Sequence, residues 1–129
     1  MSAVHVHDPE FVRSRVPGYL ERSLQLALAG VPAPFFTYRE GAFVVVIAQR
    51  REWERLAPRF PAATATAGYR LVAVTPPGPD AAFPARLRQA LADSGLEAQL
   101  LPSFHNDYVL VRDADLDRCV AVITALCGG

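Results

Sequence analysis

The residues Ala63-Thr-Ala-Thr-Ala-Gly68-Tyr-Arg-Leu-Val-Ala-Val-Thr-Pro-Pro-Gly78 give the strongest indication of the fold, because their pattern occurs twice in the chain. The stretch Ala3-Val-His-Val-His-Asp8-Pro-Glu-Phe-Val-Arg-Ser-Arg-Val-Pro-Gly18 lies 60 residues earlier and has the same order of features. Each contains a short strand-forming run, a break at Asp8 or Gly68, a second such run and a Pro-Gly pair. Because self-similarity at a fixed offset indicates duplicated structural units, we expect two copies of one supersecondary unit.

The correspondence continues beyond the Pro-Gly pairs with an offset of 65 residues. Gly30 then falls on Gly95, and residues 43–46 (FVVV) fall on residues 108–111 (YVLV). The change of offset places about five additional residues in the second Pro-Gly loop. The order of features is therefore the same in both halves, although few letters are identical.

Local patterns predict the elements of each half. Leu20, Leu24 and Leu28 recur at helical spacing, which favours a helix over residues 19–29. Alternating leucines would also fit a strand there, but the unbranched residues favour the helix. The other predicted helices cover residues 51–56, 80–93 with Asp80 as cap, and a last segment that begins at Asp113 or Asp115. The predicted strands are 10–15, 35–39, 42–48, 63–67, 69–75, 96–103 and 108–112.

These elements predict the α+β class, with two βαββαβ units at residues 1–62 and 63–129. Each unit would be an antiparallel sheet with two helices packed on one face. The second unit lacks a fourth strand, because its last helix runs almost to the end of the sequence. We therefore expect residues 3–7 to be donated to it and to pair with residues 69–75, with Val4 and Val6 towards the helices.

Composition restricts the function. The 129 residues are 51% hydrophobic and carry no net formal charge, and the basic residues are scattered arginines. Nucleic acids and anionic membranes select clustered positive charge, so neither is an expected partner. Lacking a signal peptide or a membrane-length apolar segment, the chain is expected in the cytoplasm. Cys119 and Cys127 lie on the apolar stripe of one helix, too far apart for a disulfide, and are expected to be reduced core residues.

Two stretches resemble a known family. They are Leu91-Ala-Asp-Ser-Gly95-Leu-Glu-Ala-Gln-Leu-Leu-Pro-Ser-Phe-His105-Asn-Asp-Tyr-Val-Leu-Val111 and Phe35-Phe-Thr-Tyr-Arg-Glu-Gly-Ala-Phe-Val-Val-Val-Ile47. Both look like segments of small tandem ACT-domain proteins, a group that extends to the CASTOR-type amino-acid sensors. The resemblance implies two ferredoxin-like units and a regulatory, non-catalytic protein. It also implies an amino-acid ligand where two units meet, beside the loop after the first strand of a unit.

The candidate ligand-binding residues follow from that implication. In the second half they are Thr75, Gly78 and Asp80 of the loop before the helix, and His105, Asn106 and Asp107 of the hairpin. In the first half they are Arg15, which could pair with a carboxylate but could also be a solvated surface residue, and Gly18. A structural role stays open for the second-half residues, because Asn and Asp tolerate turns and Asp80 can cap a helix. The three prolines of residues 75–80 also remove backbone donors from that loop.

No cofactor or metal is expected. His5, His7 and Asp8 are close in sequence, but no third histidine or cysteine ligand accompanies them. The sequence also lacks the patterns of nucleophilic catalysis and of phosphate-binding loops. Two alternatives to the ligand-binding protein stay open: a ligand-free dimerisation module and a small α+β sandwich enzyme. Assembly as a homodimer is compatible with all three.

Overall fold

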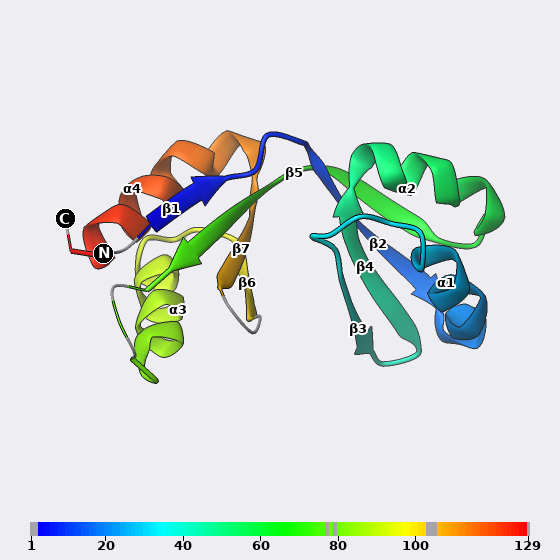
Figure 1. Ribbon diagram of the computed structural model, residues 1–129, viewed down its shortest axis with the longest axis horizontal. Helices are drawn as coiled ribbons and strands as arrows, with labels where there is room; N and C mark the ends of the chain where they lie inside the picture. Colours follow the sequence, from blue (N-terminus) through cyan, green and yellow to red (C-terminus); the bar gives the residue numbers. More distant parts are fainter. Residues whose placement is uncertain (1–2, 77, 79, 103–105, 129) are drawn as a thin grey trace. The chain divides into compact units, whose positions relative to one another are not determined.

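The computed structural model describes residues 3–76, 78, 80–102 and 106–128 of an α+β protein (Figure 1). The chain divides into two compact units. Residues 9–68 form the first, here called the N-unit, and residues up to Asp8 together with Tyr69 onward form the second, the C-unit. A boundary after residue 62 was expected from the sequence. In the structure the N-unit also includes residues 63–68, and the C-unit also includes the residues up to Asp8.

The N-unit has the order strand, helix, strand, strand, helix, strand. Its elements are β2 (Phe11–Pro17), the 3-10 turn η1 (Gly18–Leu20), α1 (Glu21–Leu28), β3 (Phe36–Glu40), β4 (Phe43–Gln49), α2 (Arg50–Leu56), the 3-10 turn η2 (Ala57–Arg59) and the first part of β5 (Thr64–Thr75). The strands lie in the order β3-β4-β2-β5, and β4 pairs antiparallel with both β3 and β2.

Alternation along the strands determines which face of the N-unit sheet meets the helices. Val12 and Val16 of β2 are buried in one cluster with Leu24 and Leu28 of α1 and with Trp53 of α2. Successive strand side chains point to opposite faces, so Arg13 and Arg15 lie on the face away from the helices. The leucine spacing therefore buries one stripe of α1, as the helix reading predicted.

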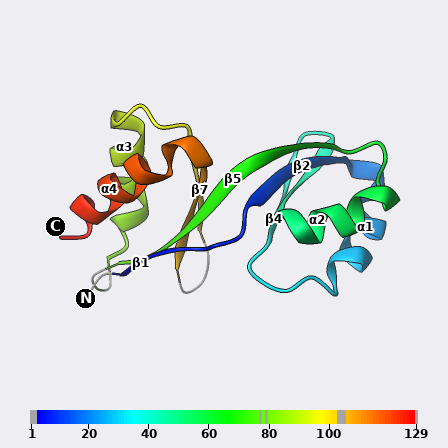
Figure 2. The ribbon, with the colours of Figure 1, turned by 90° about the horizontal axis from the view of Figure 1, so that it is seen from above.

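The C-unit repeats this order from β5 onward, except that its fourth strand comes from the start of the chain. Its elements are β1 (Ala3–Val6), the later part of β5, α3 (Phe83–Asp93), β6 (Ala98–Pro102), β7 (Asp107–Arg112), the 3-10 turn η3 (Asp113–Asp115) and α4 (Leu116–Leu126). The strands lie in the order β1-β5-β7-β6, and each neighbouring pair is antiparallel. Both helices lie on one side of the strands (Figure 2).

The first strand pairs where the duplication predicts. Val4 lies opposite Val74 and Val6 opposite Val72 on β5, and the backbone N–H of His7 donates to the carbonyl of Leu71 over 2.9 Å. Val4 and Val6 pack against the helix-covered core of the C-unit. The expected pairing of the N-terminal strand with residues 69–75, and its expected orientation, are therefore confirmed.

The core of the C-unit also contains both cysteines. Cys119 and Cys127 are free thiols buried among Leu87, Leu91 and Ile123. Burial, together with the nearby Asp115 carboxylate, raises the pKa of the Cys119 thiol to about 11. Because the thiolate is the reactive form, the folded chain holds Cys119 in an unreactive state.

Two local predictions were wrong. Residues 63–67 and 69–75 form one continuous strand rather than two, because Gly68 adopts a φ of 89° within β5, a conformation that glycine tolerates without breaking the pairing. The helix predicted from Asp80 begins at Phe83, and Asp80 is not its cap. The Asp80 carboxylate instead accepts a hydrogen bond from the N–H of Ala82 over 3.0 Å, which forms a turn ahead of the helix.

Candidate functional site

The structure brings two of the predicted C-unit residues together. Thr75 ends β5, and its Oγ1 hydroxyl donates a hydrogen bond over 3.0 Å to Oδ1 of Asn106, which directly precedes β7. The contact follows from the antiparallel pairing of β5 and β7, which places Val74 opposite Asp107. Thr75 is exposed, so this pair of side chains remains accessible to solvent.

Asp107 occupies an unusual place for a carboxylate. It is only 8% exposed at the start of β7, opposite Pro102 and Val74. Burial raises the pKa of its carboxyl. Its side chain makes no hydrogen bond or ion pair with the residues that the structure describes. Because Asp107 lies in a strand, the tolerance of aspartate for turn conformations does not explain its presence at this position.

The remaining C-unit candidates have structural partners or open surroundings. The Asp80 carboxylate, besides accepting from Ala82, forms an ion pair with Arg86 at 2.7 Å. Around Gly78, no atom of the described residues lies within 4 Å of an added Cβ. His105 lies outside the described residues. In this loop, therefore, the Asp80 carboxylate is already paired, and Gly78 has no close neighbour among the described residues.

In the N-unit the two predicted residues have different surroundings. The Arg15 guanidinium lies 4.3 Å from the centre of the Phe43 ring and 3.4 Å from a Glu40 carboxylate oxygen, so its charge is already compensated. Gly18 begins η1, and its N–H donates to the Ala42 carbonyl over 2.7 Å. A Cβ at this position would lie 2.5 Å from Nη1 of Arg39, so the absence of a side chain at Gly18 makes room for that guanidinium.

Arg39 lines a cleft that was not among the sites predicted from the sequence. The cleft lies between α1 and the edge strand β3, has a volume of about 240 Å³, and is here called the α1–β3 cleft. Buried Leu24, Leu28 and Val44 provide its apolar lining. The polar lining residues are Glu21, Gln25, Thr37, Tyr38 and Arg39.

The α1–β3 cleft carries one positive and one negative side chain. Nη1 of Arg39 lies 4.0 Å from Oε2 of Glu21, and the two side chains are 53% and 42% exposed. An ion pair at this distance and exposure contributes little to stability, so a ligand can separate its members at small cost. Arg39 has the forked geometry that binds carboxylates, and Glu21 can accept from an ammonium group.

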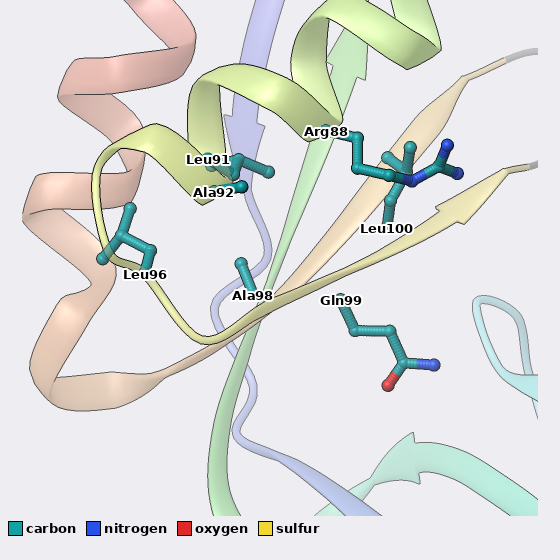
Figure 3. Close-up of a pocket in the computed structure, with 7 residues that line it drawn as sticks. All are labelled: Arg88, Leu91, Ala92, Leu96, Ala98, Gln99 and Leu100. Carbon is teal, nitrogen blue, oxygen red and sulfur yellow. The ribbon is translucent and has the colours of Figure 1, made fainter.

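A second cleft lies at the corresponding place in the C-unit, between α3 and the edge strand β6, and is here called the α3–β6 cleft. Its volume is about 320 Å³ (Figure 3). The lining is mostly apolar, with one charged residue, and comprises Arg88, Leu91, Ala92, Leu96, Ala98, Gln99 and Leu100. Figure 3 shows Gln99 on the side of β6 away from α3, and Arg88 extended beside Leu100.

The sequence contains one pattern that the helices of both clefts share. Glu21, Leu24 and Gln25 have the spacing i, i+3, i+4, and Arg88, Leu91 and Ala92 have the same spacing in the second half. In each case a charged residue lies on the helix stripe that faces the edge strand.

Other kinds of site find no support in the described part of the chain. No group of three or more His, Cys, Asp or Glu side chains there is placed to hold a metal ion. The rings of His5 and His7 lie 4.9 Å apart, and desolvation together with His5 lowers the pKa of His7. None of the described helices has the length and apolar character needed to span a membrane.

Comparison with known proteins gives the fold. Neither a family model nor a curated protein matches the sequence. A candidate C-terminal regulatory domain of aspartate kinase from Porphyromonas gingivalis superposes with a TM-score of 0.78 at 13% identity, over 100% of this chain and 99% of that one. The fold is ACT-like. At this identity the likeness extends to the fold alone.

Two further solved structures agree. The regulatory subunit of aspartate kinase from Thermus thermophilus has a TM-score of 0.68 at 12% identity, with 96% of this chain and 97% of that chain covered. The aspartate kinase of Clostridium acetobutylicum has a TM-score of 0.72 at 13% identity, with 97% of this chain and 33% of that chain covered. The structures from Porphyromonas gingivalis and Thermus thermophilus are regulatory portions of a kinase by their names.

Proposed function

We propose that this chain is a tandem pair of ACT-type units that binds a free amino acid in the α1–β3 cleft and has a regulatory, non-catalytic role. The observation that carries the proposal is the pairing of Arg39 with Glu21 across one small cleft. The likeness to the regulatory portions of aspartate kinases supports the regulatory part of it.

The chemistry of the cleft matches an amino acid. The guanidinium of Arg39 would take the carboxylate of the ligand through paired hydrogen bonds, and the carboxylate of Glu21 would take the ammonium group. The ligand would thus replace a weak exposed ion pair by two charge-assisted contacts. The side chain of the ligand would lie towards Leu24 and Val44, and Gln25 and Thr37 would provide further hydrogen-bonding groups.

Gly18 supports this arrangement from outside the cleft lining. Because Gly18 has no side chain, the Arg39 guanidinium can lie against the turn that begins η1. The ACT resemblance implies a ligand beside the loop after the first strand, and the presence of Gly18 in that loop supports the proposal. The other sequence candidates, Thr75, Asn106 and Asp107, belong to the C-unit and would serve a separate contact with ligand or partner.

The test is a thermal-shift screen with the common amino acids at millimolar concentration, followed by calorimetric titration of any that bind. A ligand at about 100 times its dissociation constant adds about 2.7 kcal/mol, and a domain of this size should then melt several degrees higher. Arg39→Gln and Glu21→Gln should each abolish the shift. Arg22→Gln removes an exposed charge that does not line the cleft and should bind as the native chain does. A flat screen, or binding that survives both cleft variants, contradicts the proposal.

Dimerisation without a ligand is the second candidate, and it too has an observation in its favour. Among the described strands, β3 and β6 each lie at the end of the strand order and pair on one side only. Exposed strand edges of this kind can pair with another chain. Sedimentation over a range of protein concentrations shows whether the chain self-associates, and the thermal-shift screen shows whether it binds an amino acid. The dimerisation module predicts self-association together with a flat screen.

A further inference from the structure

We infer that the α3–β6 cleft is a second binding site, and that its ligand is a small monocarboxylate with an aliphatic tail and no ammonium group. The inference extends the proposed ligand-binding role to a different cleft and a different class of ligand. It rests on a comparison of the two clefts residue by residue and on the surroundings of Arg88.

The helix side of the cleft differs in charge between the units. Glu21, Leu24 and Gln25 on α1 correspond in spacing to Arg88, Leu91 and Ala92 on α3. The central leucine is the same, but the acidic residue is replaced by a basic one and the amide by a methyl group. A cleft with Arg88 in place of Glu21 favours an anion where the other favours a cation.

The strand side differs in polarity. In the N-unit hairpin, Thr37 lies opposite Val46 and Arg39 opposite Val44. In the C-unit hairpin, Ala98 lies opposite Val111 and Leu100 opposite Val109. Val44 and Val46 belong to the N-unit core, and Val109 and Val111 to the C-unit core, so these pairs occupy corresponding positions. The threonine and arginine of one cleft are thus replaced by alanine and leucine.

Arg88 is the charge available to a ligand. It is exposed and forms no hydrogen bond or ion pair with any described residue. Arg86, two residues earlier on the same helix, is instead paired with Asp80 at 2.7 Å. The stem of Arg88 runs beside Leu100, so its guanidinium lies at the edge of an apolar surface (Figure 3). No acidic side chain is among the described residues that line the cleft.

These features determine the ligand class. A carboxylate would meet the Arg88 guanidinium, and an aliphatic chain would lie against Leu91, Leu96 and Leu100. An ammonium group on the same ligand would lose water without gaining an acceptor, which disfavours an amino acid relative to the corresponding acid. The volume of about 320 Å³ is at the lower end of the range for small-molecule sites.

The experiment is calorimetric titration of the full chain with 4-methylpentanoate, 4-methyl-2-oxopentanoate, leucine and the uncharged 4-methylpentanamide. The two acids should bind, and the amide should bind at least about tenfold more weakly, because a hydrogen bond to a charged group contributes enough for such a factor. Leucine is compared with the acids on Arg39→Gln, which lacks the amino-acid site proposed in the other cleft, and should bind to this variant at least about tenfold more weakly than the acids. Arg88→Gln should weaken acid binding by a similar factor. Arg86→Gln, on the same helix but outside the cleft, and Arg39→Gln, in the other cleft, should not.

Three outcomes would overturn the inference. Equal binding of acid and amide, or normal binding by Arg88→Gln, would mean that the guanidinium does not recognise the ligand. No binding by a chain that sediments as a dimer at all concentrations would mean that a second copy covers the cleft. Arg39→Gln separates the two proposals, because amino acids should no longer bind to this variant whereas the acids should bind normally. If amino acids bind to Arg39→Gln as they do to the native chain while acid binding still depends on Arg88, only the proposed amino-acid function fails.

Discussion

The N-terminal strand provides the sharpest test of how the chain folds. Val4 and Val6 of β1 pack against the core of the C-unit, although they lie at the opposite end of the sequence from most of it. Replacing both by alanine should weaken the C-unit specifically. His5→Ala is the matched control, because His5 lies between the two valines but is exposed and points away from that core.

The expected size follows from the groups removed. Each Val→Ala change deletes two methyl groups, and a fully buried group of this size contributes about 0.8 kcal/mol. Val4 and Val6 are only partly buried, so we expect about 1 kcal/mol for each substitution and about 2 kcal/mol for the pair. A loss of about 2 kcal/mol raises the population of the opened C-unit roughly 30-fold.

The two units carry separate probes, which makes the assay specific. Both cysteines of the chain, Cys119 and Cys127, are buried in the C-unit core, whereas the single tryptophan, Trp53, is buried in the N-unit. The reaction of the thiols with an aromatic disulfide under native conditions therefore reports opening of the C-unit. The Val4→Ala/Val6→Ala variant should react roughly 30-fold faster, and His5→Ala should react at the native rate.

A frayed N-terminus predicts a different result. If β1 contributed nothing to the C-unit, thiol reactivity would change less than about threefold in the double variant. Such an outcome would refute the inference that the first strand closes the second sheet. A change of Trp53 fluorescence in the same variant without a change of thiol reactivity would contradict the assignment of β1 to the C-unit as well.

Two further substitutions test individual residues by urea denaturation. Asp107→Asn should raise the free energy of unfolding at pH 7, because burial raises the pKa of this carboxyl and its ionisation in the folded chain costs stability. The advantage should shrink as the pH falls and disappear below the ordinary value of 3.8, so a gain independent of pH would contradict this cause. Gly18→Ala should lose about 1–3 kcal/mol, because its Cβ would meet Arg39 and the Ala42 carbonyl, whereas Gly78→Ala has open space and should lose little. Equal losses would count against the close packing at Gly18.

Much of the fold could be predicted because it depends on local patterns. The leucine period of α1 predicts its apolar stripe, and the continuous apolar runs of β4 and β7 predict two buried strands. The duplication predicted the order of elements and left the last helix without a strand to follow it, which led to the pairing of Val4 and Val6 with β5. The break assigned to Gly68 was wrong, because a positive φ at glycine is compatible with either a turn or a continuous strand.

The candidate sites were less accessible to sequence reasoning. The Thr75–Asn106 contact joins two predicted residues, but Arg15 and Asp80 proved to be paired with Glu40 and Arg86. A sequence identifies an arginine or an aspartate as a possible ligand. It does not state whether a neighbour has already neutralised that charge, because the neighbour is distant in the chain.

The sequence alone determined that this protein is an α+β chain of two similar halves, since hydrophobic periodicity and turn residues act over short distances. The approach of Glu21 to Arg39, and of Arg88 to the apolar lining that includes Leu100, depends on tertiary packing. Each of these pairs joins a helix to an edge strand, and the gap between them depends on how closely the helix packs on the sheet. Periodicity specifies the face on which a side chain lies, whereas packing determines the distance between faces and therefore whether a cleft exists.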